Sequence, residues 1–107
     1  MDTYVLMYTT WPDADQARSC AQILLDQKLI ACANILPRGE SLYRWNEEVT
    51  QDEEYIMLLK TRKARSADIR DAVLACHPYD TPCVLTLAID AGSSAPDFLT
   101  WIAQETC

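Results

Sequence analysis

Short apolar runs alternate with amphipathic stretches along this chain, and each kind of stretch predicts a different element. Residues 3–10 are rich in β-branched and aromatic side chains and stop at Trp11-Pro12, which predicts a strand that ends in a turn. A helix should follow, capped by Asp13 or Asp15 and ending near Leu29, because apolar residues recur there at helical spacing. That stripe consists of Ala17, Cys20, Ala21, Leu24 and Leu29.

The middle of the chain predicts apolar strands with an acidic segment between them. Residues 30–37 (IACANILP) and 41–45 (SLYRW) are typical of strand, and the Pro-x-Gly between them makes either two strands or one bent strand. Residues 46–54 (NEEVTQDEE) lack apolar periodicity, so we expect a solvated turn or strand end there. Residues 54–61 (EYIMLLKT) then predict a strong strand.

A second helix, a fourth strand and a short tail complete the pattern. The helix is indicated by apolar residues at i, i+3, i+4 and i+7, with Ser66 as a candidate cap. It should end before residues 77–82 (HPYDTP), because a residue that precedes proline is pushed out of the helical region. Residues 83–89 predict a strand and residues 97–104 a closing helix. The periodic helical positions are Ile69, Ala72, Val73 and Cys76.

The predicted order is strand, helix, strand, strand, helix, strand and a helical tail. This is the split βαβ arrangement (βαββαβ) of ferredoxin-like α+β folds, which places two helices on one face of an antiparallel sheet. The chain has 107 residues, and no linker or boundary interrupts the pattern. Residues 1–107 are therefore expected to form a single domain.

The second face of this sheet should also be apolar. Both parities of the first and third strands carry apolar side chains, whereas a solvated face would alternate with polar residues. At roughly 25 cal/mol per Å², several exposed strand side chains would strongly favour association. Self-association is the plain inference. The alternative is that the tail helix, with Phe98, Leu99, Trp101 and Ile102, folds over that face.

Net charge, the N-terminal sequence and the cysteines bear on which partners the protein binds and where it is located. The formal net charge of −7 argues against nucleic acid and anionic membranes as partners, because both require a basic surface. The N-terminus lacks the basic region and apolar run of a signal peptide, so we expect a cytoplasmic protein. Five cysteines without C-x-x-C pairs are expected to stay reduced, with Cys107 the most exposed.

The segment CHPYDTPC, residues 76–83, holds the single histidine and raises the question of a metal site. Cys76 belongs to the apolar helical stripe, and Cys83 shares strand parity with apolar residues. His77 with one further ligand does not complete a zinc site, which takes three or four protein ligands. The segment is therefore interpreted mainly as a turn. A site for Cu(I) or zinc at His77 and Cys83 of neighbouring chains is the alternative.

Other candidate binding residues each have a structural explanation as well. Lys60 interrupts an apolar strand end, where it would bind an anion or simply be solvated. Tyr43 and Trp45 would line a pocket or anchor a core or interface. The acidic residues of 47–54 could collect cations weakly, but they lack the spacing of a calcium loop and are interpreted as a solvated hairpin. No nucleophile, base and orienting group can be named together, so no catalytic residues are assigned and no enzyme is expected.

Four motifs in order, ACANILP, SLYRWNEEV, LLKT and HPYDTP, resemble the CutA family of divalent-cation tolerance proteins from about Val5 to Trp101. The resemblance implies a ferredoxin-like subunit similar to nitrogen-regulatory PII proteins and assembled as a stable homotrimer. It also implies tolerance of copper and other divalent cations, with no cofactor required. Tyr43, Trp45, Lys60, His77 and Tyr79 match family positions near the cleft between subunits, so these residues are the expected ligand-binding cleft.

Two positions depart from the family pattern. The family commonly has a glutamate directly after Thr-Pro, where this chain has Cys83, and the cysteine invoked for metal binding in some members falls here at Thr9. A thiolate at Cys83 would shift preference toward soft ions such as Cu(I). Two rival functions follow: a PII-like signalling or scaffold module that contacts proteins through residues 46–54, and an enzyme that acts through a Cys83 thiolate of low pKa.

Overall fold

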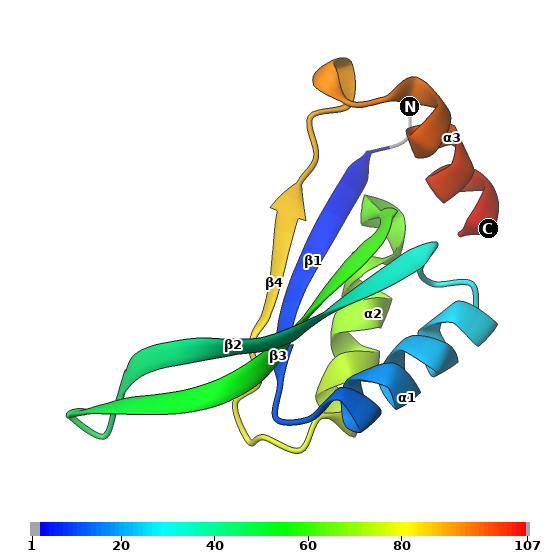
Figure 1. The fold of residues 1–107 in the computed structure, drawn as a ribbon. Coiled ribbons are helices and arrows are strands. Elements are labelled where there is room, and N and C mark those ends of the chain that lie inside the picture. The colour runs from blue at the N-terminus through cyan, green and yellow to red at the C-terminus, as the bar shows by residue number, and fades with distance from the viewer. Residues whose placement is uncertain (1–2, 107) are drawn as a thin grey trace.

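The computed structural model describes residues 3–106, and Figure 1 shows a four-stranded antiparallel sheet with helices on one side and at one end. The strand order is β2-β3-β1-β4. The elements are β1 (Tyr4–Trp11), α1 (Ala14–Asp26), β2 (Cys32–Trp45), β3 (Glu48–Arg62), α2 (Lys63–Cys76), β4 (Val84–Ala88), the 3-10 turn η1 (Ala91–Ser93) and α3 (Pro96–Glu105). The predicted α+β fold class and the order of its elements are confirmed.

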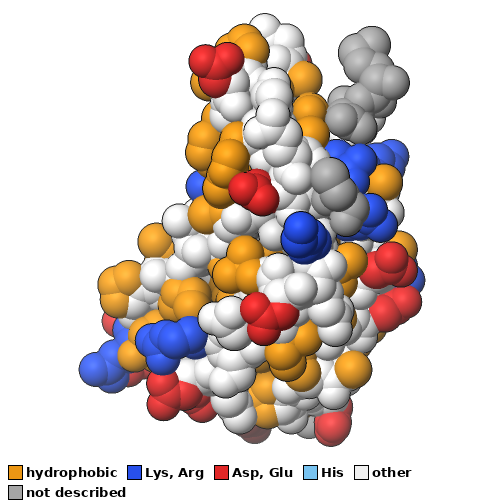
Figure 2. All heavy atoms as spheres, turned by 90° about the vertical axis from the view of Figure 1, so that its right-hand side faces the viewer, with side chains coloured by type: hydrophobic (Ala, Val, Ile, Leu, Met, Phe, Trp, Pro, Cys, Tyr) orange, Lys and Arg blue, Asp and Glu red, His pale blue; other side chains and the backbone are white. Residues whose placement is uncertain are grey.

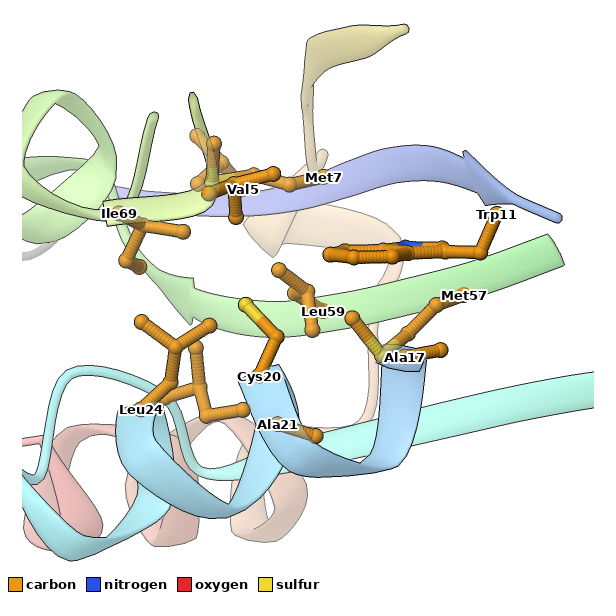
Figure 3. Close-up of a cluster of buried hydrophobic side chains, with 12 residues drawn as sticks. Val5, Met7, Trp11, Ala17, Cys20, Ala21, Leu24, Met57, Leu59 and Ile69 are labelled. Atoms are coloured by element: carbon orange, nitrogen blue, oxygen red, sulfur yellow. The ribbon is translucent and has the colours of Figure 1, made fainter. Parts of the chain in front are cut away.

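The main core lies between the sheet and helices α1 and α2. Figure 3 shows side chains of β1 and β3, among them Met7 and Leu59, pointing toward Leu24 and Cys20 of α1. The predicted stripe of α1 is buried from Ala17 to Leu24. Helix α1 begins after Asp13, whose carboxylate accepts a hydrogen bond of 2.8 Å from the Gln16 amide, so Asp13 rather than Asp15 is the cap.

Two helix boundaries differ from the prediction. Helix α1 ends at Asp26 instead of near Leu29, because Lys28 adopts a left-handed conformation (φ 58°) that stops the helix. Helix α2 begins at Lys63, one turn before the expected start. Ser66 is therefore inside the helix, where its hydroxyl donates to the Lys63 carbonyl instead of capping. The end of α2 at Cys76 agrees with the prediction.

The other face of the sheet, here called the open face, is only covered at one end. Helix α3 packs Leu99 and Ile102 against Tyr4 and Ala31, close to the start of β1. The rest of the face is mainly apolar, with Thr10, Asn34 and Lys60 as polar exceptions. Leu85 and Leu87 in β4 are 59% and 48% exposed. The predicted tail helix is confirmed, but it does not cover this face. By strand register the open face carries Leu6, Tyr8, Ile56, Leu58, Leu85 and Leu87.

Strands β2 and β3 continue past the sheet as a two-stranded ribbon, from Gly39 to Trp45 and from Glu48 to Glu54 (Figure 1). β1 pairs with β3 only up to Tyr55, so each strand of the ribbon has the other as its partner. β2 is one bent strand with an irregularity between Leu36 and Gly39, as one of the two alternatives predicted.

The acidic segment 46–54 was expected to be solvated, as a turn or strand end. It is solvated except at Glu54, which is buried, but most of it is regular strand, which was not predicted. Only Asn46 and Glu47 form a turn, and both have positive φ (49° and 67°), as a tight hairpin with right-handed strand twist requires. From Glu48 onward the segment is strand. Cross-strand pairing with β2 holds it extended despite its weak intrinsic preference for strand.

On the side of the molecule seen in Figure 2, acidic and basic side chains are interspersed with apolar ones. Among residues 3–106, no helix has the length and apolar character needed to cross a membrane. Cys107, for which the sequence predicts exposure, lies outside the described residues.

Candidate functional site

A cavity of about 540 Å³ lies where the ribbon meets the loop between α2 and β4. It continues the open face, because Tyr43, Trp45, Asp52 and Glu54 have the same side-chain parity as Ile56. Its size falls in the range of small-molecule sites. The residues that line it, here called the Glu54 cavity, are Thr10, Tyr43, Trp45, Asp52, Glu54, Pro78, Tyr79, Asp80, Thr81 and Cys83.

Carboxylates and phenols face each other inside the cavity. Glu54 is only 8% exposed and accepts a hydrogen bond of 3.3 Å from the Tyr79 hydroxyl. The Tyr43 hydroxyl donates to Asp52, and this bond raises the pKa of Tyr43 to about 12. Burial, followed by the charge of Glu54, raises the pKa of Tyr79. Both phenols therefore remain protonated donors at neutral pH.

His77 lies behind the cavity wall and is 8% exposed. Its Nδ1 accepts a hydrogen bond of 3.1 Å from the Tyr79 amide, so Nδ1 carries no proton. Its Nε2 is 2.7 Å from the Thr10 carbonyl and must be the donor. The imidazole also stacks against Trp11, with ring centroids 4.2 Å apart. Within one subunit His77 is a structural link between α2 and β1, and binding a metal would require it to give up a hydrogen bond.

Replacing His77 by alanine should lower the free energy of unfolding by about 1–3 kcal/mol, because the Thr10 carbonyl is left without its donor in a buried place. Denaturant unfolding at one fixed protein concentration measures this loss. Tyr79→Phe, which removes only the hydroxyl bonded to Glu54, is the matched control and should cost less. An unchanged midpoint for the alanine variant would contradict the structural role of the imidazole.

Cys83 lines the cavity from the start of β4 and is partly buried. Burial and then the charge of Glu54 raise the pKa of its thiol, and these effects are opposed by a hydrogen bond with Thr10. A raised pKa is the reverse of what the thiolate enzyme requires, because the thiolate is the reactive form. It also opposes a thiolate site for Cu(I) at this position within one subunit.

Lys60 is not brought into this cavity. It lies six residues from Glu54 along β3, or roughly 20 Å in an extended strand. Its ammonium group stands 5.2 Å from the centroid of the Phe98 ring, in a smaller hollow beneath α3. Within one chain the structure thus separates Lys60 from His77 and Tyr79. The expected cleft would contain all three only with Lys60 supplied by another subunit.

The structure brings together Tyr43, Trp45 and Tyr79 as expected, and adds two carboxylates that sequence reasoning left as solvated hairpin. Glu54 is buried and Asp52 is exposed, and both continue the side-chain parity of the apolar strand that follows. This shared parity is the feature of the sequence that could have placed the two carboxylates on this face. No group of three or more His, Cys, Asp or Glu side chains within residues 3–106 is arranged to hold a metal ion. The pair His77 and Cys83 therefore stays a prediction about neighbouring chains.

Comparison with known proteins places the whole chain in one family. The model of the family described as CutA1 divalent ion tolerance protein matches residues 5–105. The divalent-cation tolerance protein CutA of Thermus thermophilus is 36% identical over 106 residues, which cover 99% of each chain. Its counterpart from Archaeoglobus fulgidus is 38% identical over 98 residues, which cover 92% of this chain and 93% of the relative.

Solved structures agree with the sequence comparison. The crystal structure of CutA1 from Oryza sativa superposes with a TM-score of 0.92 at 31% identity, covering 98% of this chain and 94% of that one. CutA1 from Ehrlichia chaffeensis gives a TM-score of 0.89 at 36% identity, covering 100% and 98% of the two chains. The order of the motifs, the ferredoxin-like sheet and these matches lead to one conclusion: the chain belongs to the CutA family of divalent-cation tolerance proteins.

Proposed function

We propose that this protein is a non-enzymatic homotrimer that binds a cation in the Glu54 cavity. The observation that carries the proposal is the charge of the lining: it includes Asp52, Glu54 and Asp80, and no lysine, arginine or histidine. None of these three carboxylates takes part in an ion pair among residues 3–106. A half-enclosed site with uncompensated carboxylates favours positively charged ligands.

A divalent metal ion is the first candidate ligand, in keeping with the family. One subunit does not supply three convergent ligands, so a second subunit would have to complete the coordination with its own oxygen, nitrogen or sulfur atoms. Carboxylate oxygens suit hard ions better than Cu(I), which prefers thiolates. Copper thus remains a candidate only if Cys83 or His77 of a neighbouring chain takes part.

A small organic cation is the second candidate, and the aromatic walls favour it. Tyr43, Trp45 and Tyr79 line the same cavity as the carboxylates. An ammonium group gains from the faces of such rings in addition to carboxylate oxygens. This reading replaces the expectation that Lys60 recruits an anion, because Lys60 lies elsewhere on the sheet.

The trimer is supported by the open face and by the ribbon. Leu42 and Val49, on the ribbon face that points away from the cavity, are 66% and 68% exposed. Exposed apolar surface of this extent on a small chain is typical of an interface.

The same two side chains would serve a signalling or scaffold module that contacts another protein. A cytoplasmic location stays a prediction from the sequence.

Calorimetric titration of the purified protein with Mn²⁺, Zn²⁺, Cu²⁺ and benzylammonium, with native mass spectrometry alongside, tests the proposal. At least one cation should bind, and Glu54→Gln should weaken it at least about 10-fold, equivalent to about 1.4 kcal/mol. Asp97→Asn removes the same charge from α3, away from the cavity, and should leave the affinity unchanged. A trimer that binds none of the cations would support the protein-contact function instead.

A further inference from the structure

Two cysteine thiols from different helices meet at the edge of the core. Cys20 lies in the middle of α1, and Cys76 is the last residue of α2. Their sulfur atoms are 3.1 Å apart although 56 positions separate the residues in the chain. This is roughly 1 Å longer than the bond between the sulfurs of a disulfide, which is about 2.05 Å. A small shift of one side chain would therefore bring the two atoms to bonding distance.

The two thiols differ in access to solvent. Cys20 is 3% exposed and is surrounded by the core of α1 and the sheet. Burial, with the hydrogen bond from Cys76 as the second cause, raises the pKa of Cys20 from 9 to about 12. Cys76 is exposed, and its thiol also lies 3.6 Å from the Val73 carbonyl of its own helix. A reagent from solution can therefore reach Cys76 first.

We propose that Cys20 and Cys76 form a thiol–disulfide exchange site that takes small-molecule disulfides, with oxidised glutathione as the representative. The Cys76 thiolate attacks one sulfur of the disulfide, forms a mixed disulfide and releases one glutathione thiolate. The Cys20 thiol then attacks Sγ of Cys76 and passes its proton to the sulfur of the second glutathione, which leaves as the bond to Cys76 breaks. The first glutathione thiolate takes up one proton from solvent. Two protein thiols are oxidised and one glutathione disulfide is reduced to two thiols.

A bond between Cys20 and Cys76 would restrain the segment that leads from α2 to the Glu54 cavity. Cys76 directly precedes His77, whose ring bonds to the Thr10 carbonyl and to the Tyr79 amide. Tyr79 in turn lines the Glu54 cavity. A bond to Cys20 ties the start of this segment to α1, closes a loop of 56 residue steps and restrains the unfolded chain. The inference does not depend on the cation proposed above, since it rests on the two sulfurs alone.

The test is to incubate the purified reduced protein with excess oxidised glutathione, block free thiols with N-ethylmaleimide under denaturing conditions and map the peptides by mass spectrometry. The expected product is an intramolecular bond between Cys20 and Cys76, with Cys32, Cys83 and Cys107 recovered either as maleimide adducts or as mixed disulfides with glutathione. The oxidised protein should also melt at a higher temperature than the reduced protein. Oxidation that links Cys76 to another cysteine, or that leaves all thiols free, would overturn the proposal.

Two single variants separate the roles of the sulfurs. In Cys20→Ser, Cys76 has no resolving partner, so the reaction should stop at the glutathione mixed disulfide on Cys76. In Cys76→Ser, the buried Cys20 should remain a free thiol. A wild-type protein that stops at the same mixed disulfide as Cys20→Ser would show that Cys20 does not resolve it, and would also overturn the proposal. Cys32→Ser is the matched control and should behave as the parent does.

Discussion

Replacing Trp11 by alanine should lower the free energy of unfolding by about 3–5 kcal/mol, the usual cost of removing a large buried ring. The Trp11 side chain is fully buried, and its Nε1 donates a hydrogen bond of 2.8 Å to the Thr9 hydroxyl. That hydroxyl in turn donates to the Met57 carbonyl at 2.9 Å. The indole is therefore the first donor in two consecutive hydrogen bonds inside the core. The ring also supports the imidazole of His77.

Guanidinium unfolding followed by circular dichroism at fixed protein concentration measures this effect. Trp101→Ala is the matched control, because it removes the same ring from α3, where it is 37% exposed. The control should lose clearly less stability. Equal losses for the two variants would show that the ring at the end of β1 is not the anchor that the structure indicates.

Leu87→Asp should dissociate the proposed trimer and leave the subunit folded. Leu87 is 48% exposed on the open face, so the subunit itself loses little when the side chain changes. In an interface built on this face the carboxylate would be removed from water without a partner, which is costly. We expect the dissociation constant to rise at least about 100-fold, equivalent to about 2.8 kcal/mol.

Sedimentation velocity over a range of concentrations measures the assembly state. Leu74→Asp is the control with almost the same exposure, 47%, but it lies on the outer side of α2. It should sediment as the parent protein does. If Leu87→Asp kept the parent's assembly state and Leu74→Asp disrupted it, the interface would lie on the helices instead of the open face.

The sequence was sufficient to predict the helices and strands in which one buried face sets the spacing of the apolar residues. The stripe of α1 and the strands around Met7 and Leu59 were predictable because one hydrophobic face decides their structure. The regular strands of the ribbon were not, because its acidic residues are held extended by pairing with β2, and pairing leaves no local periodic signal. Apolar residues at both parities of β1 and β3 did predict the apolar open face that the structure shows.

The candidate site was predictable only in part, for a related reason. Tyr43, Trp45 and Tyr79 were identified through the family resemblance, whereas Glu54 was taken as solvated. Its burial depends on the α2–β4 loop, which brings Tyr79 within hydrogen-bond distance across 25 positions in the chain. The separation of Lys60 from the cavity is likewise a matter of distance along β3, which a list of motif residues does not convey. The contact between Cys20 and Cys76 depends on how two helices cross.

The weak support of the ribbon predicts that ligand binding depends on the assembly of subunits. A two-stranded ribbon without a third strand is only marginally stable in water, and four of the ten residues that line the cavity, including Tyr43 and Asp52, lie on it. Amide protons of the ribbon should therefore exchange rapidly in a dissociated subunit and slowly once neighbouring chains restrain it. In the proposed trimer, ligand affinity and assembly would then be thermodynamically linked: a ligand of the cavity would favour association of the subunits, and dilution alone would release it.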